Sequence, residues 1–278
     1  MPQPLYSASP SKLMAWLDCP RRYRMQYLER PRPLSRAQRA HTSVGVATHN
    51  ALAGFWDLPP AERTPTAVEH LIARSWIDVG FRDPDQSAQW RVRTTRRVTD
   101  YLRGIDRGRQ PLGVERTVSL HTKTLAVTGR LDRLDDRDGE LVVVDYKTGR
   151  AALSNDDART SLPLALYAVA VGAMFARGCL RVELHHLSTG KVLAHEHTPA
   201  TLARKVAEAE SIALDLRRAD ADYADRGAES KLFEPRVSPI CMWCDLRAHC
   251  PTGRLVGPEK SDWAGLEADD CASVQPSG

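Results

Sequence analysis

Two apolar segments joined by a tight turn, within residues 129–149, constrain the fold of this chain more than any other feature. The stretch is GRLDRLDDRDGELVVVDYKTG, in which the run from Leu141 to Val144 is apolar and largely β-branched. Asp138 and Gly139 separate the two segments, and an Asp-Gly pair between such segments is typical of a β-hairpin. We therefore predict two antiparallel strands that meet at this turn.

Three charged side chains are expected on one part of this hairpin. Asp132 is placed near the end of the first strand and Asp145 directly after the apolar run, so pairing across the turn brings their carboxylates together. Lys147 points to the same side as Asp145 because strand side chains alternate between faces. Taken singly, each Asp is a solvated strand-end charge and Lys147 its ion-pair partner. The combination favours a divalent cation between the carboxylates, because oxygen ligands suit magnesium or manganese.

Length and composition indicate a packed globular protein with a mild positive charge. The 278 residues suffice for one large domain or two small ones, and 42% of them are hydrophobic. The net charge of +4 is compatible with a polyanionic partner but does not establish one. No apolar run is long enough to cross a bilayer and the chain begins without a signal-peptide pattern, so we expect a cytoplasmic protein with no membrane contact.

Hydrophobic periodicity predicts helices on both sides of the hairpin and further strands beside it. The expected helices cover residues 10–18, 21–29, 37–56, 66–80, 84–107, 156–178 and 199–218, and the other strands cover 113–121, 124–134, 180–187 and 191–197. Five arginines lie on the helix predicted over residues 84–107. A solvated helix face and a surface that binds DNA explain them equally well. They are Arg91, Arg93, Arg96, Arg97 and Arg103.

The segment VVDYKTG, preceded by GRLDRLD, resembles the core of the PD-(D/E)XK nuclease superfamily and specifically its RecB-like branch. Asp132 matches the first acid of that pattern, Asp145 the second and Lys147 the lysine, although the usual proline at the start of the motif is absent. The resemblance implies an α/β fold with a restriction-endonuclease-like core, in which helices flank a mixed central sheet.

Four further residues gain a role only through this resemblance. A lone histidine on a helical stripe is more often structural, but Gly45 and His49 match the GxxxH motif of the branch. The resemblance thus implies a metal held by His49, Asp132, Asp145 and the Tyr146 backbone carbonyl. Tyr167 matches the tyrosine of a Gln-x-x-x-Tyr motif and is a candidate catalytic residue, although Pro163 occupies the glutamine position. Glu115, on the strand before the hairpin, is a weaker candidate for an additional acid.

Four of the six cysteines suggest a second metal centre. Cys241, Cys244 and Cys250 crowd into CMWCDLRAHC, and Cys19 lies alone far upstream. Spacing alone is compatible with structural zinc or with an iron–sulfur cluster. The set is similar to the four cysteines that hold a four-iron four-sulfur (4Fe-4S) cluster in RecB-like nucleases, including CRISPR-associated and helicase-linked ones. The remaining two, Cys179 and Cys271, are expected to be a buried thiol and a tail residue.

The expected organisation is a single nuclease domain over residues 1–256. It comprises a helical N-terminal part over 9–108, a core over 109–218 and a cysteine segment over 232–251, followed by a disordered tail over 257–278. The implied function is a metal-dependent DNA exonuclease or end-processing enzyme in repair, recombination or CRISPR-type processing. Its substrate would be single-stranded DNA or DNA with free ends. The alternative is a DNA-binding scaffold without activity, and since no GxxxxGK[ST] loop is present, unwinding would need a helicase partner.

Overall fold

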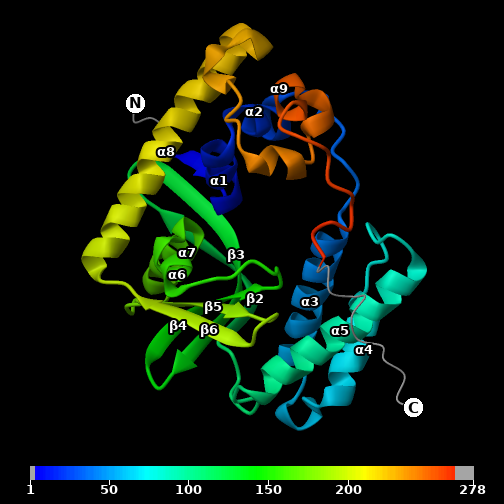
Figure 1. Cartoon of the computed structure of the whole chain (residues 1–278). Helices are drawn as coiled ribbons and strands as arrows, with labels where there is room; N and C mark the ends of the chain where they lie inside the picture. The colour runs from blue at the N-terminus through cyan, green and yellow to red at the C-terminus, as the bar shows by residue number, and fades with distance from the viewer. Residues whose placement is uncertain (1–3, 267–278) are drawn as a thin grey trace.

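A six-stranded mixed sheet forms the centre of the computed structural model, which describes residues 4–266 (Figure 1). The strand order is β1-β3-β4-β5-β6, and β2 pairs with β3 as well. Pairs β1/β3 and β4/β5 are parallel, and the other three pairs are antiparallel. The strands are β1 (Tyr6–Ala8), β2 (Gly113–His121), β3 (Leu125–Arg137), β4 (Glu140–Lys147), β5 (Arg181–His186) and β6 (Lys191–Glu196). The predicted mixed sheet flanked by helices is thus confirmed.

The β3/β4 hairpin forms at the expected turn. Asp138 and Gly139 have φ values of 55° and 98°, the left-handed conformations that a two-residue hairpin turn requires. The strand before the turn is longer than predicted, because it continues to Arg137. Asp132 consequently lies inside β3 and not near its end.

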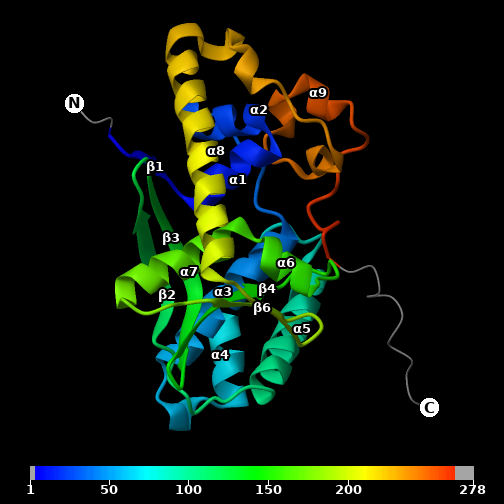
Figure 2. The same cartoon turned by 90° about the vertical axis from the view of Figure 1, so that its left-hand side faces the viewer.

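Helices cover both faces of the sheet (Figures 1 and 2). On one face, α1, α7 and α8 contribute to a core that includes Leu134 and Val143. On the other, α3, α4 and α5 pack on Val142, Val144 and Tyr146. The helices are α1 (Pro10–Asp18), α2 (Pro20–Tyr23), α3 (Ala40–Asp57), α4 (Pro65–Ser75), α5 (Pro84–Arg103), α6 (Asn155–Thr160), α7 (Leu162–Phe175), α8 (Pro199–Arg226) and α9 (Pro251–Arg254). Single helical turns lie at Arg24–Leu28, Pro60–Glu62, Gly227–Glu229, Lys231–Phe233, Pro239–Trp243 and Arg247–His249.

The helix predicted over residues 156–178 is in fact two helices. Ser161 separates α6 from α7, and its hydroxyl accepts a hydrogen bond from the Leu164 backbone amide at the start of α7. Pro163 then lies in the first turn of α7, where its missing N–H group costs nothing. A proline in the interior of one long helix would have removed a hydrogen bond, which explains the break.

Residues 257–266, which the sequence assigns to a disordered tail, pack against the rest of the chain. Among residues 257–266, the carbonyl of Asp262 accepts a hydrogen bond from Ala40 N at 3.1 Å, and Arg39 donates to Lys260 O at 3.0 Å. Leu266 is buried against Val44 and other residues of α3 and α5. This segment lacks a regular apolar period, so its packing left no sequence signal. Residues 267–278, including Cys271, lie outside the described part of the chain.

No helix in residues 4–266 is long and apolar enough to cross a membrane.

The N-terminal elements are fastened to α8 by a carboxylate. Asp220 on α8 accepts hydrogen bonds from the Tyr6 and Tyr23 hydroxyls, both at 2.7 Å. Tyr23 is fully buried, so its hydroxyl has no access to water as a substitute acceptor. This contact joins segments that are almost 200 residues apart in the sequence.

We expect Asp220→Ala to lower the free energy of unfolding by about 2–4 kcal/mol, because it leaves two tyrosine hydroxyls without their acceptor. Asp215→Ala, on an exposed part of the same helix, is the matched control and should change it by less than about 0.5 kcal/mol. Urea unfolding followed by circular dichroism measures both. Equal effects of the two substitutions would contradict the role of Asp220.

Candidate metal centre

The register of the hairpin places Asp132 directly across from Asp145. Arg133 is paired with Val144, and the next position along both strands brings the two aspartates opposite each other. The Tyr146 backbone amide donates to Asp132 Oδ2 at 2.7 Å. On the neighbouring strand, Lys147 Nζ lies 2.7 Å from Asp145 Oδ2. The expected gathering of two carboxylates and an amine is therefore present in the fold.

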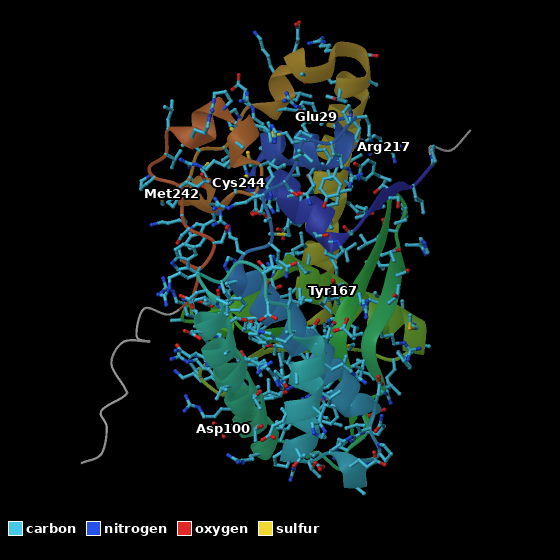
Figure 3. The ribbon with its side chains drawn as sticks, turned by 90° about the vertical axis from the view of Figure 1, so that its right-hand side faces the viewer. Glu29, Asp100, Tyr167, Arg217, Met242 and Cys244 are labelled. Atoms are coloured by element: carbon cyan, nitrogen blue, oxygen red, sulfur yellow. The ribbon has the colours of Figure 1, made fainter. Side chains whose placement is uncertain are left out.

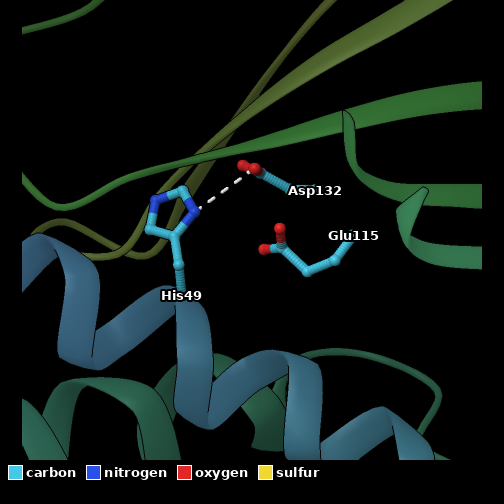
Figure 4. Close-up of side chains that lie close together, drawn as sticks. All are labelled: His49, Glu115 and Asp132. Atoms are coloured by element: carbon cyan, nitrogen blue, oxygen red, sulfur yellow. Dashed lines mark ion pairs between the residues drawn. The ribbon is translucent and has the colours of Figure 1, made fainter. Parts of the chain in front are cut away.

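Helix α3 adds an imidazole and β2 adds a third carboxylate. His49 Nδ1 lies 3.2 Å from Asp132 Oδ1 (Figure 4). Ligand atoms of His49, Glu115 and Asp132 all lie within 4.8 Å of one another. Within residues 4–266, this is the only group of three or more such side chains that meets this distance. All three side chains are partly buried, so the group is neither sealed from water nor fully exposed.

Glu115 reaches this group through an unusual backbone conformation. Its φ is 45°, a left-handed value that an L-residue other than glycine, Asn or Asp seldom adopts. Arg130 on β3 lies beside it, with Nε 2.7 Å from Glu115 Oε2 and 3.0 Å from the Glu115 carbonyl oxygen. Backbone strain of this kind persists where surrounding contacts hold it and is concentrated at functional sites. Glu115 is only a weak candidate from the sequence, because no sequence pattern predicts a glutamate in the left-handed conformation.

The pKa values show that negative charge is in excess here. Burial, and next the charge of Asp132, raises the pKa of Glu115. Burial also raises the pKa of Asp145; Lys147 opposes this and Asp132 adds to it. For His49, burial lowers the pKa, but the hydrogen bond and charge of Asp132 outweigh that effect and the pKa is raised. Burial is thus the largest cause for both carboxyl groups, and the nearby negative charge of Asp132 adds to it in each case.

The donor set fits a hard divalent cation. It offers carboxylate oxygens and one imidazole nitrogen, the donors that magnesium and manganese accept. Asp145 Oδ2 is buried, and its contact with Lys147 is an ion pair without good hydrogen-bond geometry. A cation at this position would relieve the repulsion that raises the carboxylate pKa values.

Tyr167 on α7, labelled in Figure 3, is near enough to Asp145 and Asp132 for their charges to act on its hydroxyl. Burial, followed by the charges of Asp145 and Asp132, raises its pKa to about 12. A Cβ atom on Gly129 would lie 2.6 Å from Tyr167 Cε1, so only glycine at this place on β3 allows the ring to pack there. Pro163 lies one turn earlier on α7 and carries no group that binds a phosphate or a metal.

The four cysteines of the predicted cluster line one cavity of about 30 Å³. Cys19 lies between α1 and α2, and the other three lie in the C-terminal segment beside these helices, where Figure 3 labels Cys244. Among the described residues, no three cysteine sulfurs approach within 4.8 Å of one another. The fold thus brings the two ends of the set together without forming a compact group of sulfurs. Cys179 is buried, as expected, and its thiol contacts the Leu141 carbonyl.

The arginines of α5 divide into two groups. Arg93 and Arg97 lie over the ring of Trp90, at 4.9 and 5.4 Å from its centroid. Arg91, Arg96 and Arg103 line a groove of about 520 Å³ between α4 and α5. The groove also contains Glu69 and Asp100, so its charge is mixed.

Comparison with known proteins identifies the family. No curated protein matches the chain. A crystal structure of a protein from Eubacterium rectale, provisionally assigned as an exonuclease, aligns with a TM-score of 0.48 and 11% identity over 98% of this chain and 94% of its own. That of SSO0001 aligns with a TM-score of 0.28 and 12% identity over 87% and 95%. Both scores are too low to support an argument. The sequence model of the PD-(D/E)XK nuclease superfamily, however, matches residues 7–251. The chain therefore belongs to the PD-(D/E)XK nuclease superfamily.

Proposed function

We propose that this protein is a metal-dependent deoxyribonuclease of the RecB-like branch, acting as an exonuclease or as an end-processing enzyme. The observation that carries the proposal is the approach of His49, Glu115 and Asp132 to within 4.8 Å, beside the ion pair of Asp145 with Lys147. Three carboxylates are gathered here, and the pKa values of Glu115 and Asp145 are raised, which is typical of functional sites. A hydrolytic metal site accounts for this arrangement.

The proposed ligands are His49, Asp132, Asp145 and the Tyr146 backbone carbonyl, and Glu115 completes the set. Bound Mg²⁺ or Mn²⁺ supplies a Lewis acid for the phosphodiester and lowers the pKa of a water molecule. Tyr146 supports the arrangement through its amide, which holds Asp132. Because the ligands come from α3, β2, β3 and β4, the site depends on the assembled fold.

Two side chains are proposed to act on the substrate directly. Lys147 orients the attacking water or neutralises the charge that develops on the phosphoryl oxygens. Tyr167 donates a hydrogen bond to a phosphate oxygen, since its pKa of about 12 keeps the hydroxyl protonated at neutral pH. The proposed substrate is single-stranded DNA or DNA with free ends, in the cytoplasm. A helicase, CRISPR or repair partner would deliver it.

The absence of the glutamine from the Gln-x-x-x-Tyr motif favours a second candidate, a DNA-binding scaffold with weak or no activity. Pro163 occupies that position and cannot replace the amide. One assay separates the two candidates: purified protein is incubated with labelled single- and double-stranded DNA, with and without Mn²⁺. Metal-dependent shortening of the DNA supports the nuclease, and binding without cleavage supports the scaffold.

We further propose a 4Fe-4S cluster held by Cys19, Cys241, Cys244 and Cys250. All four cysteines line one cavity, which supports a shared metal centre. The choice of an iron–sulfur cluster over zinc rests on the resemblance to the RecB-like nucleases that hold one. The cluster would be structural, because hydrolysis transfers no electron. It would connect the N-terminal helices to the C-terminal segment.

We expect Asp145→Asn and Lys147→Ala each to lower the cleavage rate by at least about 10²-fold. The first removes a carboxylate ligand of the metal, and the second removes the ammonium group that acts at the phosphate. The melting temperature should change little, since both side chains lie outside the apolar core. Full activity in either variant would refute the assignment of that residue. Lys12→Ala, a lysine next to α8 and outside the site, should leave cleavage unchanged.

His49→Ala and Glu115→Gln should weaken metal binding more than they change stability. A weakened ligand set is partly compensated by more metal, so raising the Mn²⁺ concentration should restore part of the lost cleavage. The Mn²⁺ concentration at half-maximal activity measures this. If no Mn²⁺ concentration recovers activity in either variant, these residues act otherwise than as ligands.

Substituting the cysteines should separate the cluster from the nuclease site. We expect brown protein, and loss of both the colour and much of the soluble yield in Cys19→Ser and Cys250→Ser, because a bridge between distant segments stabilises strongly. Cys179→Ser and Cys271→Ser should change neither. Colourless protein with one zinc per chain would show that the four cysteines bind zinc and not an iron–sulfur cluster. Metal-free protein after anaerobic preparation would refute both kinds of metal centre.

A further inference from the structure

Tyr146 lies between Asp145 and Lys147, yet its side chain lies on the other face of the sheet. Only 3% of the residue is exposed, and the ring packs among residues of α3 and α5. Its hydroxyl accepts hydrogen bonds from Trp56 Nε1 at 3.0 Å and from Arg133 Nη1 at 3.1 Å. The middle residue of the Asp-Tyr-Lys segment is thus fixed from behind the metal centre.

Arg133 is itself held firmly. It is 4% exposed, and its guanidinium contacts Asp135 twice, from Nε to Oδ1 and from Nη2 to Oδ2, both at 2.9 Å. The guanidinium also lies over the ring of Trp56, 4.9 Å from its centroid. The two donors to the Tyr146 hydroxyl therefore support each other, and a hydrogen bond from a buried charged donor is worth more than a neutral one.

The same tyrosine reaches two groups of the proposed metal site. Its backbone amide binds Asp132, the residue that precedes Arg133 on β3. Its ring meets the His49 ring edge-on at 6.0 Å between centroids. Asp132 and Arg133, which are adjacent on β3, therefore hold Tyr146 of β4 at two points. Asp132 binds its backbone amide, and Arg133 binds its hydroxyl.

We propose that the Tyr146 side chain is a positioning residue that fixes Asp132, Asp145 and His49 at the spacing a divalent cation needs. This role rests on the proposed metal-dependent function and deepens it. The Arg133 and Trp56 donors prevent β4 from sliding or rotating relative to β3. Without them, the distances from Asp132 to the Tyr146 amide and to the Asp145 carboxylate are no longer fixed.

The test is Mn²⁺ binding measured by titration calorimetry without DNA. Tyr146→Phe keeps the ring and its contact with His49 but lacks the hydrogen-bonding hydroxyl. We expect its Kd for Mn²⁺ to rise by about 10-fold or more, the size of effect seen when the support of a metal ligand is removed. Trp56→Phe removes one of the two donors and should give an intermediate rise, which keeps the test open if Tyr146→Phe folds poorly.

Tyr101→Phe is the matched control. The Tyr101 hydroxyl accepts from the same Arg133 Nη1 at 3.2 Å and contacts His185, but no interaction links Tyr101 to Asp132 or His49 in the described structure. It should lower the melting temperature to a similar degree and leave the Kd for Mn²⁺ unchanged. An unchanged Kd in Tyr146→Phe, or equal rises in both variants, would refute the positioning role. Failure of the unaltered protein to bind Mn²⁺ would instead refute the metal-dependent nuclease itself, and this role with it.

Discussion

The hydrogen bond from the Tyr146 amide to the Asp132 carboxylate is the contact on which the site depends. Strands β3 and β4 pair regularly from the turn as far as Arg133 and Val144. Beyond that pair, a side-chain oxygen becomes the acceptor for the β4 amide. Asp132 is thereby held facing Asp145, and helix α3 needs only to bring one histidine to complete the approach.

The two faces of strands β3 and β4 carry different sets of charged side chains. One face gathers carboxylates, and burial together with the charge of Asp132 raises the pKa values of Asp145 and Glu115. The other face buries Arg133, whose Nη atoms donate hydrogen bonds to Asp135 and to two tyrosines and whose Nε forms an ion pair with Asp135. Burying a charge is tolerable when it is paired with an opposite charge and hydrogen-bonded. A rigid polar layer thus lies directly behind the layer that holds repelling charges in place.

Local patterns predicted the central hairpin, the mixed sheet and the alignment of Asp145 with Lys147, because turn chemistry and side-chain alternation act over a few residues. Features that depend on distant contacts could not be predicted in this way. The three-residue strand β1 is too short to leave a pattern, and its pairing with β3 comes from the assembled sheet. Glu115 needed a left-handed backbone held by Arg130. The split between α6 and α7 is the exception, since Pro163 is a local signal for the start of a helix.

The first strand and the first helices of the chain find their partners only in later segments. β1 pairs with β3, Tyr23 binds a carboxylate of α8, and Cys19 faces a cavity lined by residues up to Gly253. During synthesis, these early segments leave the ribosome before their partners. β1 can pair once β3 has emerged, whereas Tyr23 and Cys19 gain their contacts only after α8 and the segment up to Gly253 have followed.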